Sequence, residues 1–391
     1  MARVSDTATF NTKTYRDTVA TMRARRERVH DAGERVYRET GRLDPNVDIH
    51  GNRRLSRNSM VRDGDHFILK NGIALPIFSG FDGTGSMGGN VAKAFEAIPV
   101  IDTMLAGIRH RYNTQIASAV VQDVVDTHPV FQMSQFESDI RIAEQIRLLV
   151  PDHGGGDETE DYDLCPTFLW LATQTDISDF YGLKGYAMIV GDQIGRGTVT
   201  AEDVKEYLGH TLQTRSMATK AICQALLPKW HIFYVHVGSG GGGSRDFATD
   251  WWTDKLGQGR VLIVPDPDLL AEVQAGLIYT TETLDPTESG MIEFLLSGGA
   301  NKRITEREAR EVWKWIKDAG IPFGAQAKLP GYNEIPKPGD VFAHLRHAWP
   351  EGHPRASENV TPTETGEGEV AALPAETPTK KTGKPIDWNK F

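Results

Sequence analysis

The sequence is poor in cysteine. It contains only two cysteines, Cys165 and Cys223, in 391 residues. Neither has another cysteine or a histidine at the spacing of a zinc site, which argues against a structural zinc and a disulfide framework. Both lie in apolar stretches with a helical pattern, so we expect two buried free thiols in a reducing compartment.

Long apolar runs and excess positive charge are also missing. No stretch approaches the roughly 18 apolar residues that cross a membrane. The first residues, from Met1 to Asp6, are polar, unlike a secretory signal peptide. Acidic residues outnumber basic ones, 53 against 43. Because phosphate binding needs a basic surface, we do not expect nucleic acid as the partner. Because a membrane-spanning run and a signal peptide are both missing, we expect a cytoplasmic protein without a membrane partner.

The composition divides the chain into four regions. Residues 1–60 are polar and rich in arginine, 65–283 alternate short apolar runs with helical periodicity, 286–350 have a helical pattern, and 351–391 are rich in Pro, Thr, Glu and Lys. We therefore expect one main domain over 65–283, with a helical extension on each side. The last region is expected to be a disordered tail.

The main region predicts a mostly parallel sheet. Strands are expected at Gly72–Phe81, Gln115–Val121, Gly185–Gly191, Trp230–Val237 and Arg260–Val264, with a short edge strand at Val130–Phe136. Helices are expected at Asn90–Ile108, Asp139–Leu149, Leu164–Thr175, Ala201–Leu212, Met217–Leu227 and Leu269–Leu277. This alternation is typical of a doubly wound α/β fold, in which helices cover both faces of the sheet.

The two extensions also carry helical signals. One helix is predicted over Tyr15–Tyr37, and its arginine cluster suits either an acidic partner or a solvated face laced with acids. Thr305 and Glu308 predict a capping box that begins another helix. A third, short helix is predicted from Phe342, Leu345 and Trp349. Finally, the aromatic residues Trp388 and Phe391 at the end of the tail predict a short partner-binding motif.

The segment with the clearest chemistry runs from Ser79 to Gly89. It follows an apolar strand and precedes a helix, and ligands of open α/β sheets bind at the carboxyl ends of strands. Asp82, Thr84 and Ser86 alternate along it, so a tight glycine-rich turn can direct their three oxygens to one point. Oxygen ligands suit a hard cation, Mg²⁺ or Mn²⁺ more than Ca²⁺.

The run Asp82-Gly83-Thr84-Gly85-Ser86-Met87 resembles the metal-ion-dependent adhesion site of von Willebrand factor A (vWA) domains, in its Asp-x-Thr-Gly-Ser-Met form. In that family the motif follows the first core strand, as it does here. The resemblance covers about residues 65–283. It implies a doubly wound, Rossmann-like vWA fold with a cation at the end of the first strand.

Two further loops match the family's other ligand loops by position. The segment from His153 to Asp161 is similar to the second loop, where Thr159 matches by residue type and Asp157 is the rival ligand. Asp192 directly follows a predicted strand and falls where the family has its final aspartate. The resemblance therefore implies a metal site made of Asp82, Thr84, Ser86, Asp192 and either Thr159 or Asp157.

This ligand set implies a binding module and not an enzyme. Hydroxyls are neutral ligands, so the cation keeps positive charge and attracts a carboxylate from outside. We therefore expect a protein partner that supplies a Glu or Asp to the metal. Two other roles stay open: a structural subunit of a large assembly, such as a phage particle or a cytoplasmic complex, and an adaptor of an AAA-type ATPase.

Other readings of the same motifs are weaker. Phe81-Asp82-Gly83-Thr84 is similar to the Asp-x-Asp-Gly-Thr motif of haloacid dehalogenase-like phosphatases, but the nucleophilic aspartate is replaced by Gly80. The glycine run Gly238–Gly243 satisfies a dinucleotide-binding pattern trivially, and no strong helix signal follows it at once. We predict a flexible loop there, at the rim of the metal site.

Overall fold

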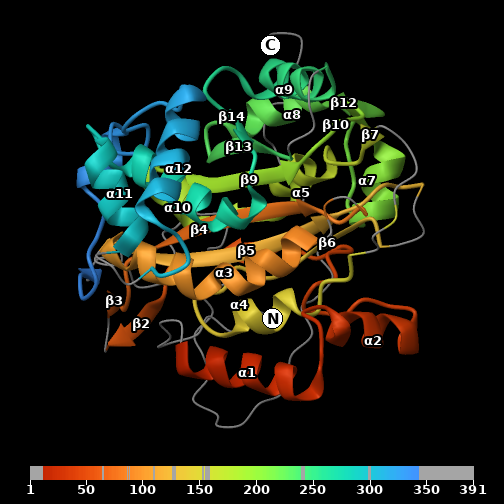
Figure 1. Cartoon of the computed structure of the whole chain (residues 1–391), viewed down its shortest axis with the longest axis horizontal. Coiled ribbons are helices and arrows are strands. Elements are labelled where there is room, and N and C mark those ends of the chain that lie inside the picture. The colour runs from red at the N-terminus through yellow and green to blue at the C-terminus, as the bar shows by residue number, and fades with distance from the viewer. Residues whose placement is uncertain are drawn as a thin grey trace. The chain divides into compact units, whose positions relative to one another are not determined.

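The computed structural model describes residues 12–63, 66–85, 87, 89–108, 111–125, 129–151, 154, 159–238, 243–297 and 301–342. Within these residues the fold is mixed α/β, around a six-stranded sheet (Figure 1). Its strands are β4 Ile73–Asp82, β5 Tyr112–Val121, β6 Phe131–Met133, β9 Gly185–Gly191, β13 Trp230–Val237 and β14 Val261–Val264. They lie in the order β14-β13-β9-β4-β5-β6.

The sheet confirms the prediction of a mostly parallel arrangement with one short edge strand. Five strands run parallel, and β6 pairs with β5 in the antiparallel sense. Strands β9 and β13 begin and end at the predicted residues. The signal was strong because β4, β9 and β13 are buried along their whole length, which requires continuous apolar runs.

The helices pack against the sheet in two groups (Figure 1). One group consists of α3 Gly89–Leu105, α4 Arg141–Ile146, α10 Leu270–Glu282, α11 Glu288–Leu296 and α12 Glu306–Asp318. The other consists of α5 Leu164–Ala172, α7 Ala201–Leu208, α8 Thr219–Leu226 and α9 Gly243–Leu256. In β13, Phe233 and Val235 join the first group's core, whereas Ile232 and Tyr234 join the second's. Because side chains alternate along a strand, the two groups cover opposite faces.

Short strands and turns connect these elements. The short strands are β1 Arg54–Ser56 with β8 Thr173–Thr175, β2 Met60–Asp63 with β3 His66–Leu69 and β15 Val341–Phe342, β7 Thr159–Glu160 with β10 Ile194–Gly195, and β11 Thr198–Thr200 with β12 Ser216–Ala218. The remaining elements are α6 Asp176–Tyr181 and the 3₁₀ turns η1 Ala106–Ile108, η2 Pro267–Leu269 and η4 Pro330–Asn333. Such strands are too short for a periodic signal, so the sequence did not predict them.

Two predicted helices end earlier than expected. The helix over Leu164–Thr175 stops at Ala172, because the next three residues pair with β1. The helix over Ala201–Leu212 stops at Leu208, because Gly209 adopts a left-handed conformation with φ of 66°. In both cases the apolar period continues past the true end, and a backbone partner or a glycine decides the boundary.

A helix also forms where none was predicted. Helix α9 begins at Gly243, directly after the glycine run, and continues to Leu256. Its polar residues mask the helical period, but Ala248, Trp252 and Leu256 are buried on one face of it. The expectation that no helix opens after the run is therefore wrong, whereas residues 239–242 lie outside the described part of the chain.

The predicted helix over Tyr15–Tyr37 is two helices, α1 Thr12–Arg25 and α2 Asp31–Thr40. The break falls at Arg26, which adopts a left-handed backbone conformation with φ of 56°. Tyr15 and Met22 of α1 are buried, and the hydroxyl of Tyr15 donates to the carbonyl of Phe95 in α3. The arginines at 23, 25, 26 and 28 are exposed, and Arg28 pairs with acidic neighbours, as expected of a solvated face.

Within the described residues, the C-terminal region contains one of the two helices predicted for it. The capping box of Thr305 and Glu308 is present at the start of α12. Phe342, however, forms the short strand β15 with β3 and not a helix. Residues 343–391, including Trp388 and Phe391, lie outside the described residues.

Cys165 and Cys223 are free and buried, as predicted. Among the described helices, none has the length and apolarity needed to cross a membrane.

Candidate functional site

The first candidate loop begins at the last residue of β4. The Asp82 carboxylate is fully buried, and its Oδ1 accepts hydrogen bonds from the backbone N–H of Thr84 at 2.7 Å and the Thr84 hydroxyl at 2.6 Å. Gly83 allows the turn, because a Cβ there would lie 2.5 Å from Val120 Cγ1. The loop therefore holds Asp82 and Thr84 together as predicted, whereas Ser86 lies outside the described residues.

The second candidate loop lies against the first. The backbone N–H of Gly85 donates to the carbonyl of Gly154 at 2.5 Å. Thr159 is half-buried in β7, which pairs with β10 of the third loop, and its hydroxyl accepts from Arg196 at 3.2 Å. Asp157, the rival ligand, lies outside the described residues. The three loops thus meet at the carboxyl edge of the sheet, with Thr159 held toward Arg196.

The third candidate loop follows β9, the strand next to β4. Asp192 is half-buried directly after this strand. Phe81 of β4 is paired with Val190 of β9, so Asp82 and Asp192 follow at the same edge of the two strands. The negative charge of Asp192 contributes to raising the pKa of Asp82 and of the Tyr162 and Tyr234 hydroxyls. The carboxyl ends of β4 and β9 therefore bring Asp82 and Asp192 together, as the sequence predicts.

The electrostatics of Asp82 are those of a carboxylate removed from water. Burial is the largest cause that raises its pKa above the ordinary aspartate value, and Asp192 adds to it. The hydrogen bonds from Thr84 and Tyr162 act in the opposite direction. These donors are neutral groups, so they stabilise the ionised form without supplying positive charge. A cation at this position would compensate both carboxylates.

Tyr162 is a site residue that the sequence did not predict. It is completely buried, and its hydroxyl donates to Oδ2 of Asp82 at 2.6 Å. It also lies against the third loop, because a Cβ on Gly191 would meet the Tyr162 hydroxyl at 2.5 Å. One side chain from the second loop thus contacts the other two loops. The sequence signal was only its place in the acidic run from Asp157 to Asp163.

Arg196 is the second unpredicted residue, and it joins the acids around the site. Its Nη2 pairs with Asp123 at 2.5 Å, and its Nε pairs with Asp161 at 2.8 Å. Its backbone N–H donates to Asp163 at 2.5 Å. Glu160, Asp161 and Asp163 are buried.

Aromatic side chains support the third loop from the second helix group. The carbonyl of Gln193 accepts hydrogen bonds from the Tyr234 hydroxyl at 2.8 Å and the Trp252 indole at 3.2 Å. The Tyr234 and Trp252 rings are stacked, with centroids 4.5 Å apart. This fully buried support fixes the backbone that carries Asp192 and Arg196.

The donor chemistry fits a hard cation. The Thr84 hydroxyl gives its proton to Asp82, which leaves the lone pairs of its oxygen for another group. Within the described residues no three His, Cys, Asp or Glu side chains are grouped to hold a metal. The predicted set contains only two described carboxylates, Asp82 and Asp192, and is completed by hydroxyls. The fit therefore rests on Asp82, Thr84 and Asp192.

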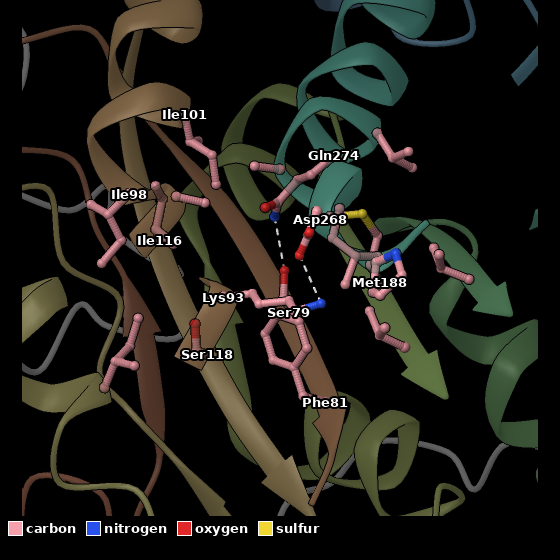
Figure 2. A pocket seen from close by; sticks show the side chains of 18 of the residues that line it. Ser79, Phe81, Lys93, Ile98, Ile101, Ile116, Ser118, Met188, Asp268 and Gln274 are labelled. Carbon is pink, nitrogen blue, oxygen red and sulfur yellow. Dashed lines mark hydrogen bonds and ion pairs between the residues drawn. The ribbon is translucent and has the colours of Figure 1, made fainter. Parts of the chain in front are cut away.

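A separate pocket lies between the sheet and two helices of the first group, α3 and α10 (Figure 2). Ser79 and Gln274 face each other across it at 2.8 Å, and Lys93 pairs with Asp268 at its edge at 2.7 Å. Its lining is mostly apolar, and its volume of about 30 Å³ holds one or two water molecules. It is too small for a cofactor, so it does not replace the carboxyl-edge site.

Comparisons with known proteins name no family. No protein-family profile and no curated protein sequence matches this chain. Among solved structures, proximal thread matrix protein 1 from the mussel byssus shares 13% identity with a TM-score of 0.30, covering 52% of this chain and 47% of its own. The open form of the pilus adhesin SpaC from Lactobacillus rhamnosus GG shares 10% identity with a TM-score of 0.33, covering 56% and 32%. At these TM-scores neither likeness supports a statement on fold or function.

Proposed function

We propose that this chain carries a doubly wound vWA-type domain that binds a protein partner through a divalent cation. The strand order supports the fold. From β4 the chain proceeds to β5 and β6 on one side, and later to β9, β13 and β14 on the other. The order therefore reverses between β4 and β9. Ligands of open α/β sheets bind at the carboxyl end of such a switch point.

The observation that carries the proposal is the placement of Asp82 and Asp192. Asp82 ends β4 and Asp192 directly follows β9, the two strands that flank the switch point, and the charge of Asp192 adds to the burial that raises the pKa of Asp82. Asp82, Thr84 and Asp192 would hold the cation, with Ser86 and Asp157 or Thr159 as the further ligands that the sequence predicts. When bound, the cation supplies positive charge and a coordination position for a carboxylate of the partner.

The chain's own residues prepare this contact. Thr84 orients Asp82 through two hydrogen bonds, and Tyr162 fixes its second oxygen. Arg196 neutralises the acids next to the site, so a partner carboxylate is not repelled by the charge of Asp161. We propose no catalytic step. The other two roles, structural subunit and ATPase adaptor, use the same site only if their contact needs the cation.

The proposal is tested by capture of partners from the native cell extract. Wild type, Asp82→Ala and the control Asp254→Ala are compared, each with Mg²⁺ and with chelator. Asp254 is an exposed aspartate of α9, so its loss removes a surface charge and its exposed pairs with Lys220 and Lys255. Circular dichroism first confirms that each variant is folded. We expect wild type and the control to capture the same protein in the presence of Mg²⁺ but not in the presence of chelator. Asp82→Ala should capture it in neither condition.

Capture that survives both chelation and Asp82→Ala would contradict the metal-dependent function. That result favours a structural subunit whose contacts lie on other surfaces.

A further inference from the structure

We propose that Tyr162 sets the cation selectivity of the carboxyl-edge site, because it leaves the Asp82 carboxylate a single free acceptor position. This inference rests on the proposed function and concerns which cation the site takes. It starts from the hydrogen bonds of Asp82, which come from two segments of the chain. Thr84 lies in the same loop, whereas Tyr162 reaches the carboxylate from the second loop.

The acceptor positions of Asp82 can be counted. A carboxylate has about four lone-pair positions, two on each oxygen. Both positions of Oδ1 are used by Thr84, through its backbone N–H at 2.7 Å and its hydroxyl at 2.6 Å. One position of Oδ2 is used by the Tyr162 hydroxyl at 2.6 Å. Counting the bonds from the described residues, a single position on Oδ2 is left, so Asp82 has one oxygen to offer a cation or a cation-bound water.

The packing around Tyr162 keeps its hydroxyl on the Asp82 carboxylate. Its side chain is completely buried. The backbone of Gly191 lies against its hydroxyl on one side, and its ring is packed beside Tyr234 and Trp252, with centroids 6.4 and 6.3 Å away. The hydroxyl has no open space to turn into. The carboxylate plane of Asp82 is therefore fixed from both of its oxygens.

A carboxylate with one free position discriminates between cations. Ca²⁺ takes 6–8 oxygen ligands in flexible geometry and often binds a carboxylate through both oxygens, whereas Mg²⁺ needs octahedral geometry and keeps several waters. A fixed, one-position carboxylate suits Mg²⁺. Without the Tyr162 hydroxyl, Oδ2 gains a position and the carboxylate gains freedom to turn, which favours Ca²⁺ more than Mg²⁺.

The test compares Tyr162→Phe with wild type and with Tyr112→Phe, by calorimetric titration of each folded protein with Mg²⁺ and with Ca²⁺. Tyr112→Phe is the matched control, because its hydroxyl is also buried and also donates to a carboxylate, that of Glu282, which lies away from the carboxyl-edge site. We expect Tyr162→Phe to raise the Ca²⁺ affinity relative to the Mg²⁺ affinity by about tenfold, the scale of one hydrogen bond to a charged group. The control should keep the wild-type ratio.

A second variant serves if Tyr162→Phe does not fold. Gly191→Ala keeps the tyrosine but places a Cβ 2.5 Å from its hydroxyl, which displaces the hydroxyl from Asp82 and should shift the ratio in the same direction. If wild type binds Mg²⁺ but both variants keep its ratio, or Tyr112→Phe shifts the ratio equally, the selectivity role is wrong while the proposed function stands. If wild type binds neither cation, both are wrong.

Discussion

The Arg196→Ala variant is expected to lose about 3 kcal/mol of unfolding free energy, measured by urea denaturation. Arg196 donates from three nitrogens of its guanidinium to two segments: to Asp123 after β5, and to Asp161 and the hydroxyl of Thr159 in the second loop. The Asp123 side chain is fully buried and that of Asp161 is 10% exposed. Removing the guanidinium of Arg196 leaves the carboxylates of Asp123 and Asp161 close together without its positive charge. Such a loss costs far more free energy than the loss of a surface ion pair.

Arg310→Ala is the matched control for this variant. Arg310 also pairs with two acids, Glu288 at 2.7 Å and Glu306 at 2.5 Å, but its side chain is 54% exposed. Because both pairs are exposed to solvent, their loss should leave the free energy of unfolding nearly unchanged. Adding Asp123→Asn to Arg196→Ala should restore part of the lost stability, because one of the two stranded charges is removed. Equal losses for Arg196→Ala and Arg310→Ala would show that the buried carboxylates do not depend on Arg196.

Glu282→Gln is expected to be more stable than wild type by about 2 kcal/mol at pH 8, and equal to it near pH 4. Glu282 ends α10 beneath the opposite edge of the sheet, where the hydroxyls of Tyr186 and Tyr112 donate to its carboxylate at 2.9 and 3.2 Å. Burial is the largest cause that raises its pKa to about 7, from an ordinary value of 4.5, and the tyrosines oppose this only in part.

The direction of the pH dependence follows from proton binding. Between pH 4.5 and 7 the unfolded chain has lost the Glu282 proton while the folded chain keeps it. Stability from this group is therefore complete below about pH 4.5 and is lost as the pH rises through about 7. Glutamine stays neutral at every pH, so the variant does not lose this unfolding free energy as the pH rises. Thermal unfolding across this pH range measures the difference, with Glu206→Gln on exposed α7 as the control. A constant difference between wild type and Glu282→Gln at all pH values would contradict the account.

The sheet and the first loop were predictable because their signals are local. Strands such as β9 are continuous apolar runs bounded by glycine, so their ends can be read directly from the residues. Asp82 and Thr84 are two residues apart, and Gly83 between them indicates a tight turn that brings them together. The position of Asp192 followed from its place after a strand, because the carboxyl ends of parallel strands share one edge.

The rest of the candidate site depends on contacts between distant segments. The hydroxyl of Tyr162 reaches Asp82 across 80 positions of sequence, and Arg196 reaches Asp123 across 73. Neither residue has a local pattern that sets it apart from any other tyrosine or arginine. The break at Arg26 was likewise hidden, because a left-handed backbone conformation is expected of glycine or asparagine. Tertiary packing decides these features, and one sequence does not display it.

The most direct test of the metal site is a crystal of the protein soaked in Mn²⁺ and measured for anomalous scattering. The account predicts one strong peak at the carboxyl ends of β4 and β9, within coordination distance of Thr84 and beside Asp82 and Asp192. The same soak of an Asp82→Ala crystal should lack this peak. No peak in the wild type, or a peak elsewhere that Asp82→Ala leaves unchanged, would contradict the proposal that this edge of the sheet binds a cation.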